Sequence, residues 1–221
     1  MNVRQRGFTL VEIAIVLVII GLLLGGILKG QEMITQAKIK NVIADMSGVS
    51  AAMYGYQDRY KALPGDDKGA TRWTTAGILA GDGDGIIEGT YLAGAASEAG
   101  QFWFHLRSAG FVSGTGADNP FNAVSGKMGV QTGDGTANTP AAVLATVGPP
   151  AVPGFTGLML CSANLPDKIA ISVDSQMDDG NGKTGSVRTQ KQAAPNPATI
   201  AAAADAYSED GVSSYVVCRQ M

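Results

Sequence analysis

Residues 8–28 read FTLVEIAIVLVIIGLLLGGIL, and this apolar stretch decides how the rest of the chain is arranged. Glu12 is its single charged residue. A helix of this length, at about 1.5 Å of rise per residue, spans the roughly 30 Å hydrocarbon core of a bilayer. We therefore predict that residues 8–28 form a transmembrane helix.

A short basic segment, MNVRQRG at residues 1–7, precedes the apolar stretch. Arg4 and Arg6 are expected to hold the N-terminus in the cytoplasm, so that the remainder of the chain lies outside. An ordinary signal anchor or a secretory signal peptide would have a similar layout. A secretory peptide, however, is cut after its apolar stretch, beside small residues. Both of these readings leave Glu12 unexplained.

The carboxylate of Glu12 needs a partner, because an unpaired charge inside an apolar helix costs about 2.5–3.5 kcal/mol or more. No basic side chain in residues 8–28 can supply that partner. Cleavage after Gly7 would create a free amine on Phe8. Within one helix this amine is poorly placed, whereas the amine of a neighbouring subunit, displaced along a filament axis, could meet Glu12 directly.

The sequence RGFTLVE at residues 6–12 resembles the type III signal of type IV pilins and of the pseudopilins of type II secretion. In that family a dedicated membrane aspartyl peptidase cuts after the glycine and methylates the new N-terminal phenylalanine. The resemblance therefore implies cleavage after Gly7, methylation of Phe8 and removal of residues 1–7 as a leader. It also implies that Glu12 pairs with the N-terminal amine of the adjacent subunit during assembly.

In one respect the chain departs from many pilins, which carry a proline late in the apolar helix where the helix loosens in the filament. Here no proline occurs before Pro64. Glycine costs a helix about 1 kcal/mol relative to alanine, and it also allows close helix packing in membranes. Either role is open for the glycines of this region, which are Gly21, Gly25, Gly26 and Gly30.

The helical pattern continues beyond the membrane segment, through residues 29–63. Apolar side chains recur every three or four positions, at Ile39, Val42, Met46, Val49, Met53, Tyr56, Tyr60 and Leu63. This spacing predicts an amphipathic half of the same helix, which would run from about residue 8 to 62 and end at Leu63-Pro64-Gly65. Its apolar face would pack on the chain's own sheet or form a coiled-coil seam.

Residues 64–221 are predicted to form one globular domain. The resemblance implies an α+β, pilin-like fold, in which the long helix packs on a small antiparallel sheet with long loops and one or two short helices. A Gly-Asp-rich loop followed by an aromatic-His-Leu-x-x-Ala-Gly segment also looks like that of many uncharacterised pilin-like proteins.

Local sequence patterns predict the strands and helices of this domain. Candidate strands lie near residues 127–131, 142–147, 157–161 and 215–218. A helix is predicted at residues 95–109, and another begins at Asn164-Leu165-Pro166 and ends at Asp178-Asp179-Gly180. Residues 181–206 are predicted to be a loop.

The only two cysteines are Cys161 and Cys218. An even number of cysteines in an exported domain favours one disulfide, and two buried thiols are the alternative. Pilins commonly have a disulfide near the C-terminus, which this pair resembles, although it encloses an unusually long loop.

Two acidic clusters are candidate cation sites. Asp82, Asp84 and Glu88 lie in GDGDGIIE at residues 81–88, which partly resembles a calcium loop. This segment lacks the third alternating acidic residue and the twelve-residue spacing of an EF-hand. The second cluster comprises Asp174, Asp178 and Asp179. Solvated turn residues are the alternative for both clusters, and no cofactor is predicted apart from this calcium.

The sequence contains few residues or motifs that could support catalysis. It has one histidine, His105, no Cys-x-x-Cys pair and no phosphate-binding glycine motif after a strand. His105 is expected to be a packed or surface histidine rather than a ligand. The net charge is −3, and it becomes −5 once Arg4 and Arg6 leave with the leader. Because these catalytic motifs are missing, the chain is not expected to be an enzyme. Its acidic balance argues against binding to nucleic acid.

These features predict a structural subunit of a type IV pilus-like helical filament. Its partners would be further copies of itself, other pilins, the prepilin peptidase and methylase, and an inner-membrane assembly platform. It would reside in the inner membrane as a precursor and then in an extracellular pilus. The alternatives are a minor pilin, a periplasmic pseudopilin of type II secretion, or an adhesive module carried on a filament.

Overall fold

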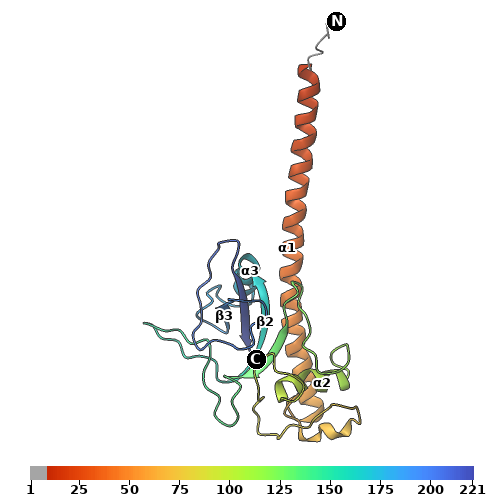
Figure 1. The fold of residues 1–221 in the computed structure, drawn as a ribbon, viewed down its shortest axis with the longest axis vertical. Helices are drawn as coiled ribbons and strands as arrows, with labels where there is room; N and C mark the ends of the chain where they lie inside the picture. The colour runs from red at the N-terminus through yellow and green to blue at the C-terminus, as the bar shows by residue number, and fades with distance from the viewer. Residues whose placement is uncertain (1–8) are drawn as a thin grey trace, which may run out of the picture. The chain divides into compact units, whose positions relative to one another are not determined.

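The computed structural model describes residues 9–221, which form two units: the part of the chain before Ile39, and Ile39–Met221 (Figure 1). The helix α1, Leu10–Tyr60, runs through both. Its 51 residues agree with the single helix predicted over residues 8–62. The predicted cleavage and methylation positions, Gly7 and Phe8, lie outside the described residues.

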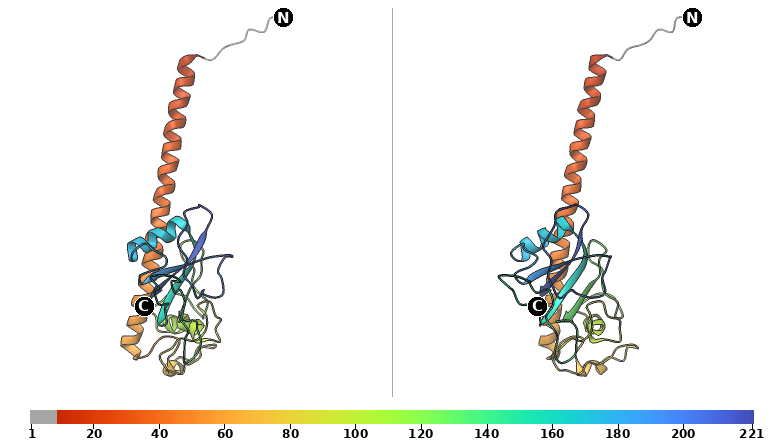
Figure 2. Two further views of the ribbon diagram at one scale, coloured as in Figure 1. Left: turned by 90° about the vertical axis from the view of Figure 1, so that its left-hand side faces the viewer. Right: turned by 60° about the vertical axis from the view of Figure 1, so that its left-hand side comes forward.

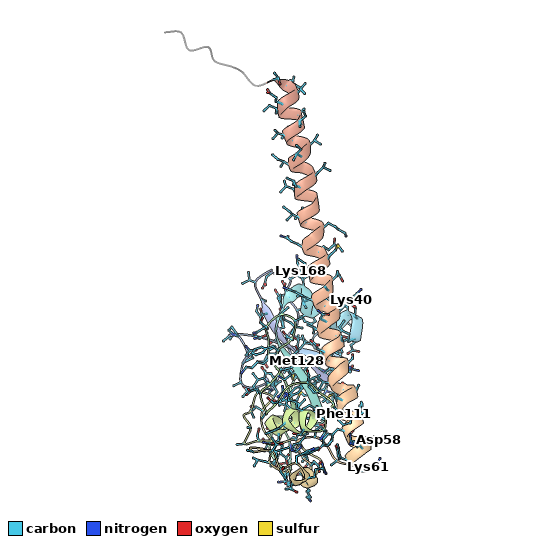
Figure 3. All side chains as sticks on the ribbon, turned by 90° about the vertical axis from the view of Figure 1, so that its right-hand side faces the viewer. Lys40, Asp58, Lys61, Phe111, Met128 and Lys168 are labelled. Carbon is cyan, nitrogen blue, oxygen red and sulfur yellow. A yellow bond between two sulfur atoms is a disulfide. The ribbon has the colours of Figure 1, made fainter. Side chains whose placement is uncertain are left out.

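The first unit is the apolar part of α1. Its side chains project from the helix on every side, as Figure 3 shows, and are exposed throughout Leu10–Leu28. Among the described residues, α1 is the one helix whose length and composition suit a membrane span. Added methyl groups at its four glycines would meet nothing within 4 Å, so these glycines serve no packing purpose within the single chain.

In the second unit, the apolar stripe of α1 is buried. Six of its eight predicted members are less than 9% exposed, namely Ile39, Val42, Met46, Val49, Met53 and Tyr56. They share one core cluster with residues of the sheet, and Tyr60 and Leu63 pack against it. The stripe therefore covers the chain's own sheet, which confirms that alternative over the coiled-coil seam.

Four antiparallel strands form the sheet in the order β1-β2-β4-β3. The strands are β1 (Met128–Thr132), β2 (Leu158–Pro166), β3 (Val187–Lys191) and β4 (Ser214–Gln220). Three shorter helices complete the domain: η1 (Lys68–Arg72), α2 (Glu98–Ser108) and α3 (Asp167–Met177). This α+β, pilin-like architecture confirms the predicted fold class.

Alternating strand residues give the sheet two buried faces. Val130, Leu160 and Val217 lie in the core cluster that includes α1, α2 and α3, and Figure 2 shows α3 beside α1. Met159 and Val216 lie in a second cluster, which loop residues complete. The domain thus has helices on one face of the sheet and loops on the other.

Three local predictions were wrong. Residues 142–147 form only isolated bridges, because their hydrogen bonds go to separate loops. No helix begins at Asn164: β2 continues through Pro166 across a register shift, where Asn164 has a φ of 57°, and α3 starts at Asp167. Residues 181–206 include the strand β3, whose polar sequence VRTQK gave no apolar signal.

Candidate functional site

Glu12 lies in the first turn of α1 and caps its own helix. Its Oε2 accepts hydrogen bonds from the Thr9 backbone N–H at 2.7 Å and from the Thr9 hydroxyl at 2.8 Å. The Glu12 backbone N–H donates in return to the Thr9 hydroxyl at 3.3 Å. This reciprocal pattern is a capping box, which satisfies N–H groups that a helix terminus leaves without partners.

The cap supplies hydrogen bonds to Glu12 but no positive charge. Among residues 9–221, no lysine or arginine forms an ion pair with this carboxylate. A charge without a cation remains costly in an apolar surrounding. The pairing of Glu12 with the amine of Phe8 stays a prediction, since Phe8 lies outside the described residues.

Cys161 and Cys218 form a disulfide, as predicted. The two residues face each other in the register of β2 and β4, with their Cα atoms 4.0 Å apart. Both are fully buried. The bond therefore joins the last strand of the chain to the centre of the sheet, beneath the loop-covered face.

The predicted acidic loop has a different membership in space. Carboxylate oxygens of Asp82 and Asp84 come together with one of Asp66, all within 4.8 Å of one another, and Glu88 is not in this group. Asp66 is only 3% exposed and accepts hydrogen bonds from the backbone N–H groups of Gly83 and Gly85, the latter at 2.8 Å.

Glu98, at the start of α2, holds the same loop from the other side. Its carboxylate accepts from the backbone N–H groups of Asp82 at 3.1 Å and Glu88 at 3.2 Å. Burial, together with the negative charges of Asp66 and Asp82, raises the pKa of Glu98 to about 7. The loop is thus organised around acceptor oxygens, and calcium binding there stays a prediction.

In the second acidic cluster, carboxylates again accept hydrogen bonds from the surrounding chain. Oxygens of Asp174, Asp178 and Asp179 lie within 4.8 Å of one another. Asp174 is fully buried and accepts from the Tyr207 hydroxyl at 2.8 Å, and burial raises its pKa to about 6. Asp179 accepts from the Thr184 hydroxyl at 2.5 Å. Here too the carboxylates accept hydrogen bonds from residues that follow α3 in the chain.

His105 is a packed residue, as expected. It is fully buried, its Nδ1 accepts from the Gly65 N–H at 2.9 Å, and its Nε2 lies 2.8 Å from the Leu79 carbonyl. With Nδ1 accepting, the proton resides on Nε2 and is donated to Leu79. Burial lowers the pKa of His105, so the ring stays neutral and joins two points of the loop before α2.

A buried polar cluster lies beside His105 and was not predicted from the sequence. The Asp67 carboxylate accepts from the Tyr56 hydroxyl at 2.5 Å and from Arg72 at 2.6 Å. Burial favours a raised pKa for Asp67, but the hydrogen bonds from Arg72 and Tyr56 outweigh it and lower the pKa. The cluster ties the chain after α1 back onto the helix. Its signal is an Asp three residues after Pro64, where the helix stops, and five residues before an arginine.

A long apolar helix joined to a helix-covered antiparallel sheet defines a pilin-like protein. Residues 2–28 match the family model of the prokaryotic N-terminal methylation motif. That motif marks the type IV pilin and pseudopilin family, whose members are typically structural rather than enzymatic. No curated protein and no solved structure matches the sequence or fold of this chain. Motif and apolar helix together indicate an inner-membrane precursor of a pilus-like filament.

The raised pKa of Glu98 predicts that acid stabilises the domain. A folded-state pKa of about 7 lies above the ordinary value of 4.5, so the favourable contribution is complete below pH 4.5 and is lost as the pH rises through 7. Because Glu98 is partly exposed, we expect about 1 kcal/mol between pH 5 and pH 8. Glu98→Gln should reduce this pH dependence in unfolding experiments on the full chain in detergent.

Glu209→Gln is the matched control, because Glu209 is an exposed glutamate of the same domain. This variant should keep the wild-type pH dependence. An unchanged dependence in Glu98→Gln would contradict the assignment and would point to Asp174 as the main titrating group.

Proposed function

We propose that the chain is a structural subunit of a type IV pilus-like helical filament. The observation that carries this proposal is the exposure of the apolar part of α1. Between Leu10 and Leu28 its large apolar side chains are 45% to 88% exposed, on all sides of the helix. Such a surface requires lipid or other helices around it. Lipid would cover it in the precursor, and neighbouring subunits would cover it in the filament.

Each part of the chain has a role in this proposal. The peptidase removes residues 1–7 and leaves a methylated Phe8 at the new N-terminus. Residues 8–28 pass from the membrane to the filament core, residues 29–63 carry the helix into the domain, and residues 64–221 form the filament surface. Repeating one head-to-tail contact without closing a ring produces a helical filament.

The charge of Glu12 would select the register of each incoming subunit. The carboxylate meets the Phe8 amine of the adjacent subunit, and apolar contacts along α1 then supply most of the cohesion. The same N-terminal machinery would serve a minor pilin or a type II secretion pseudopilin. Two observations distinguish a main pilin from a minor pilin or a pseudopilin. They are the abundance of the chain in the filaments and the location of those filaments.

The proposal is tested on filaments sheared from cells that express the full chain. Electron microscopy should show filaments, and N-terminal sequencing and mass analysis should identify their main subunit as this chain beginning with methylated Phe8. Filaments in which this chain is rare would favour the minor pilin. A filament fraction without the chain, from cells that process it normally, would contradict the proposal.

Gly7→Ala is expected to stop processing, because the peptidase of this family cuts after glycine at this position. The precursor should accumulate in the membrane, and filaments should disappear. Immunoblots read the ratio of precursor to mature chain. Gly21→Ala is the matched control, since an added methyl group there has open space around it, and this variant should be cleaved normally. Normal cleavage of Gly7→Ala would refute the cleavage site.

A further inference from the structure

Two long segments of the domain, residues 135–166 and 192–204, contain no charged side chain. At the chain average of 16% charged residues, about seven of their 45 positions would be charged. Apart from the buried strand β2, these segments are loops, which are usually polar surface. A loop surface without charge therefore needs an explanation.

The two segments lie together over the loop-covered face of the sheet. Ala145 and Ala203 form a bridge, and the Leu144 N–H donates to the Ala201 carbonyl at 3.0 Å. Phe155 and Ile200 point inward and bury the disulfide cluster. We call residues 135–157 and 192–204 the neutral layer.

Arg188 of β3 fixes the neutral layer in one conformation. The Arg188 side chain is only 6% exposed, and its guanidinium donates to the carbonyls of Leu144, at 3.0 Å, and Pro153. Its guanidinium carbon also lies 4.4 Å from the centre of the Phe155 ring. These contacts hold both ends of the segment from Leu144 to Phe155, so little further ordering is needed when its tip binds a partner.

The tip of this segment presents an apolar surface. Val147 is 82% exposed, and the following residues, 148–151, are also exposed. A bridge between Thr146 and Val152 closes its base. Within the neutral layer no exposed aromatic side chain is present that could stack on sugar rings or bases, and no basic side chain that could bind phosphate. This tip therefore suits contact with a protein surface that offers no complementary charge.

We propose that the neutral layer, led by the tip at residues 147–151, is a contact surface for a second copy of this chain. The inference rests on the proposed function, in which every subunit touches neighbours. The mature chain carries a net charge of −5, so identical copies repel one another. A layer without charge can be buried between them without burying an unpaired charge, and depletion of charge is typical of interface cores.

Val147→Asp tests the contact on the full chain. The side chain is exposed in the single subunit, so the domain should fold and form its disulfide, which mass analysis checks. In the filament the new carboxylate would be buried without a partner, and the yield of sheared filaments should fall about tenfold. Leu79→Asp is the control, because Leu79 is an exposed apolar residue, 48% accessible, outside the neutral layer. This control should keep the wild-type yield.

A photo-crosslinking amino acid at position 147 tests the same contact independently. In assembled filaments it should link two copies of this chain, and the membrane pool of unassembled subunits should give no such product. Crosslinks to a different protein would overturn the inference, as would a normal filament yield from Val147→Asp or an equal loss in Leu79→Asp. If wild-type cells formed no filaments, the proposed function itself would fail, so the two failures are distinguishable.

Discussion

Replacing Glu12 with glutamine should abolish filaments almost as completely as replacing it with alanine. Both variants lack the negative charge that would meet the Phe8 amine of the next subunit. Removing one partner of a buried ion pair costs about 3–5 kcal/mol, which exceeds a hundredfold in the affinity of each subunit contact. Immunoblots of sheared filaments and of membranes should show the chain inserted, cleaved and unassembled.

The structure makes glutamine the decisive variant. Glu12 accepts hydrogen bonds from Thr9, and a glutamine at this position can also form a capping box. Alanine removes both the cap and the charge, whereas glutamine removes the charge alone. Wild-type filament yield from Glu12→Gln would therefore mean that the carboxylate serves only as a helix cap.

Thr9→Val supplies the complementary control. It removes the hydroxyl that joins the cap and leaves the charge of Glu12 in place. Loss of a cap costs about 1 kcal/mol, so assembly should be weakened only modestly. A loss of filaments in Thr9→Val as large as that in Glu12→Gln would show that the helix end, and not the charge, governs assembly.

Removing the disulfide should have the largest effect on the stability of the domain. Cys161 and Cys218 are 57 residues apart in sequence, and closing a loop of that length stabilises the folded state by about 4 kcal/mol on the chain-entropy model. We expect the double variant Cys161→Ala/Cys218→Ala to lose about this much of its free energy of unfolding. Denaturant titration of the full chain in detergent measures the difference.

Reductant provides the control for this pair of substitutions. Both cysteines are fully buried, so the bond becomes accessible when the domain unfolds. Titration in reductant should lower the stability of the wild-type chain close to that of the double variant, and it should leave the double variant unchanged. A double variant within about 1 kcal/mol of the oxidised wild type would contradict the predicted contribution of the bond.

The long helix was predictable because its signals are local. Apolar residues three and four positions apart lie on one helix face, and the pattern from Ile39 to Tyr56 is the stripe that the core buries. The stop before Pro64 follows from the conformational restrictions that proline imposes. Neither feature depends on residues distant in sequence.

The sheet and the polar clusters were less accessible to prediction. The strand β3 is recognisable only through its pairing with β4, since VRTQK has no apolar periodicity. Asp66 joins Asp82 and Asp84 from the far end of a long loop, and the buried Asp67 carboxylate accepts a hydrogen bond from Tyr56, on the preceding helix. Such groupings are made by the path of the chain in space, which no short sequence window contains.

The sequence alone determined the apolar helix, its amphipathic continuation, the family motif and the candidate disulfide, because each depends on residue type and short spacing. Only the tertiary structure decided that the acidic loop closes around Asp66 and that two charge-free loops form one layer over the sheet. These outcomes depend on hydrogen bonds and burial between residues far apart in the chain, whose free energies arise only once the sheet has assembled.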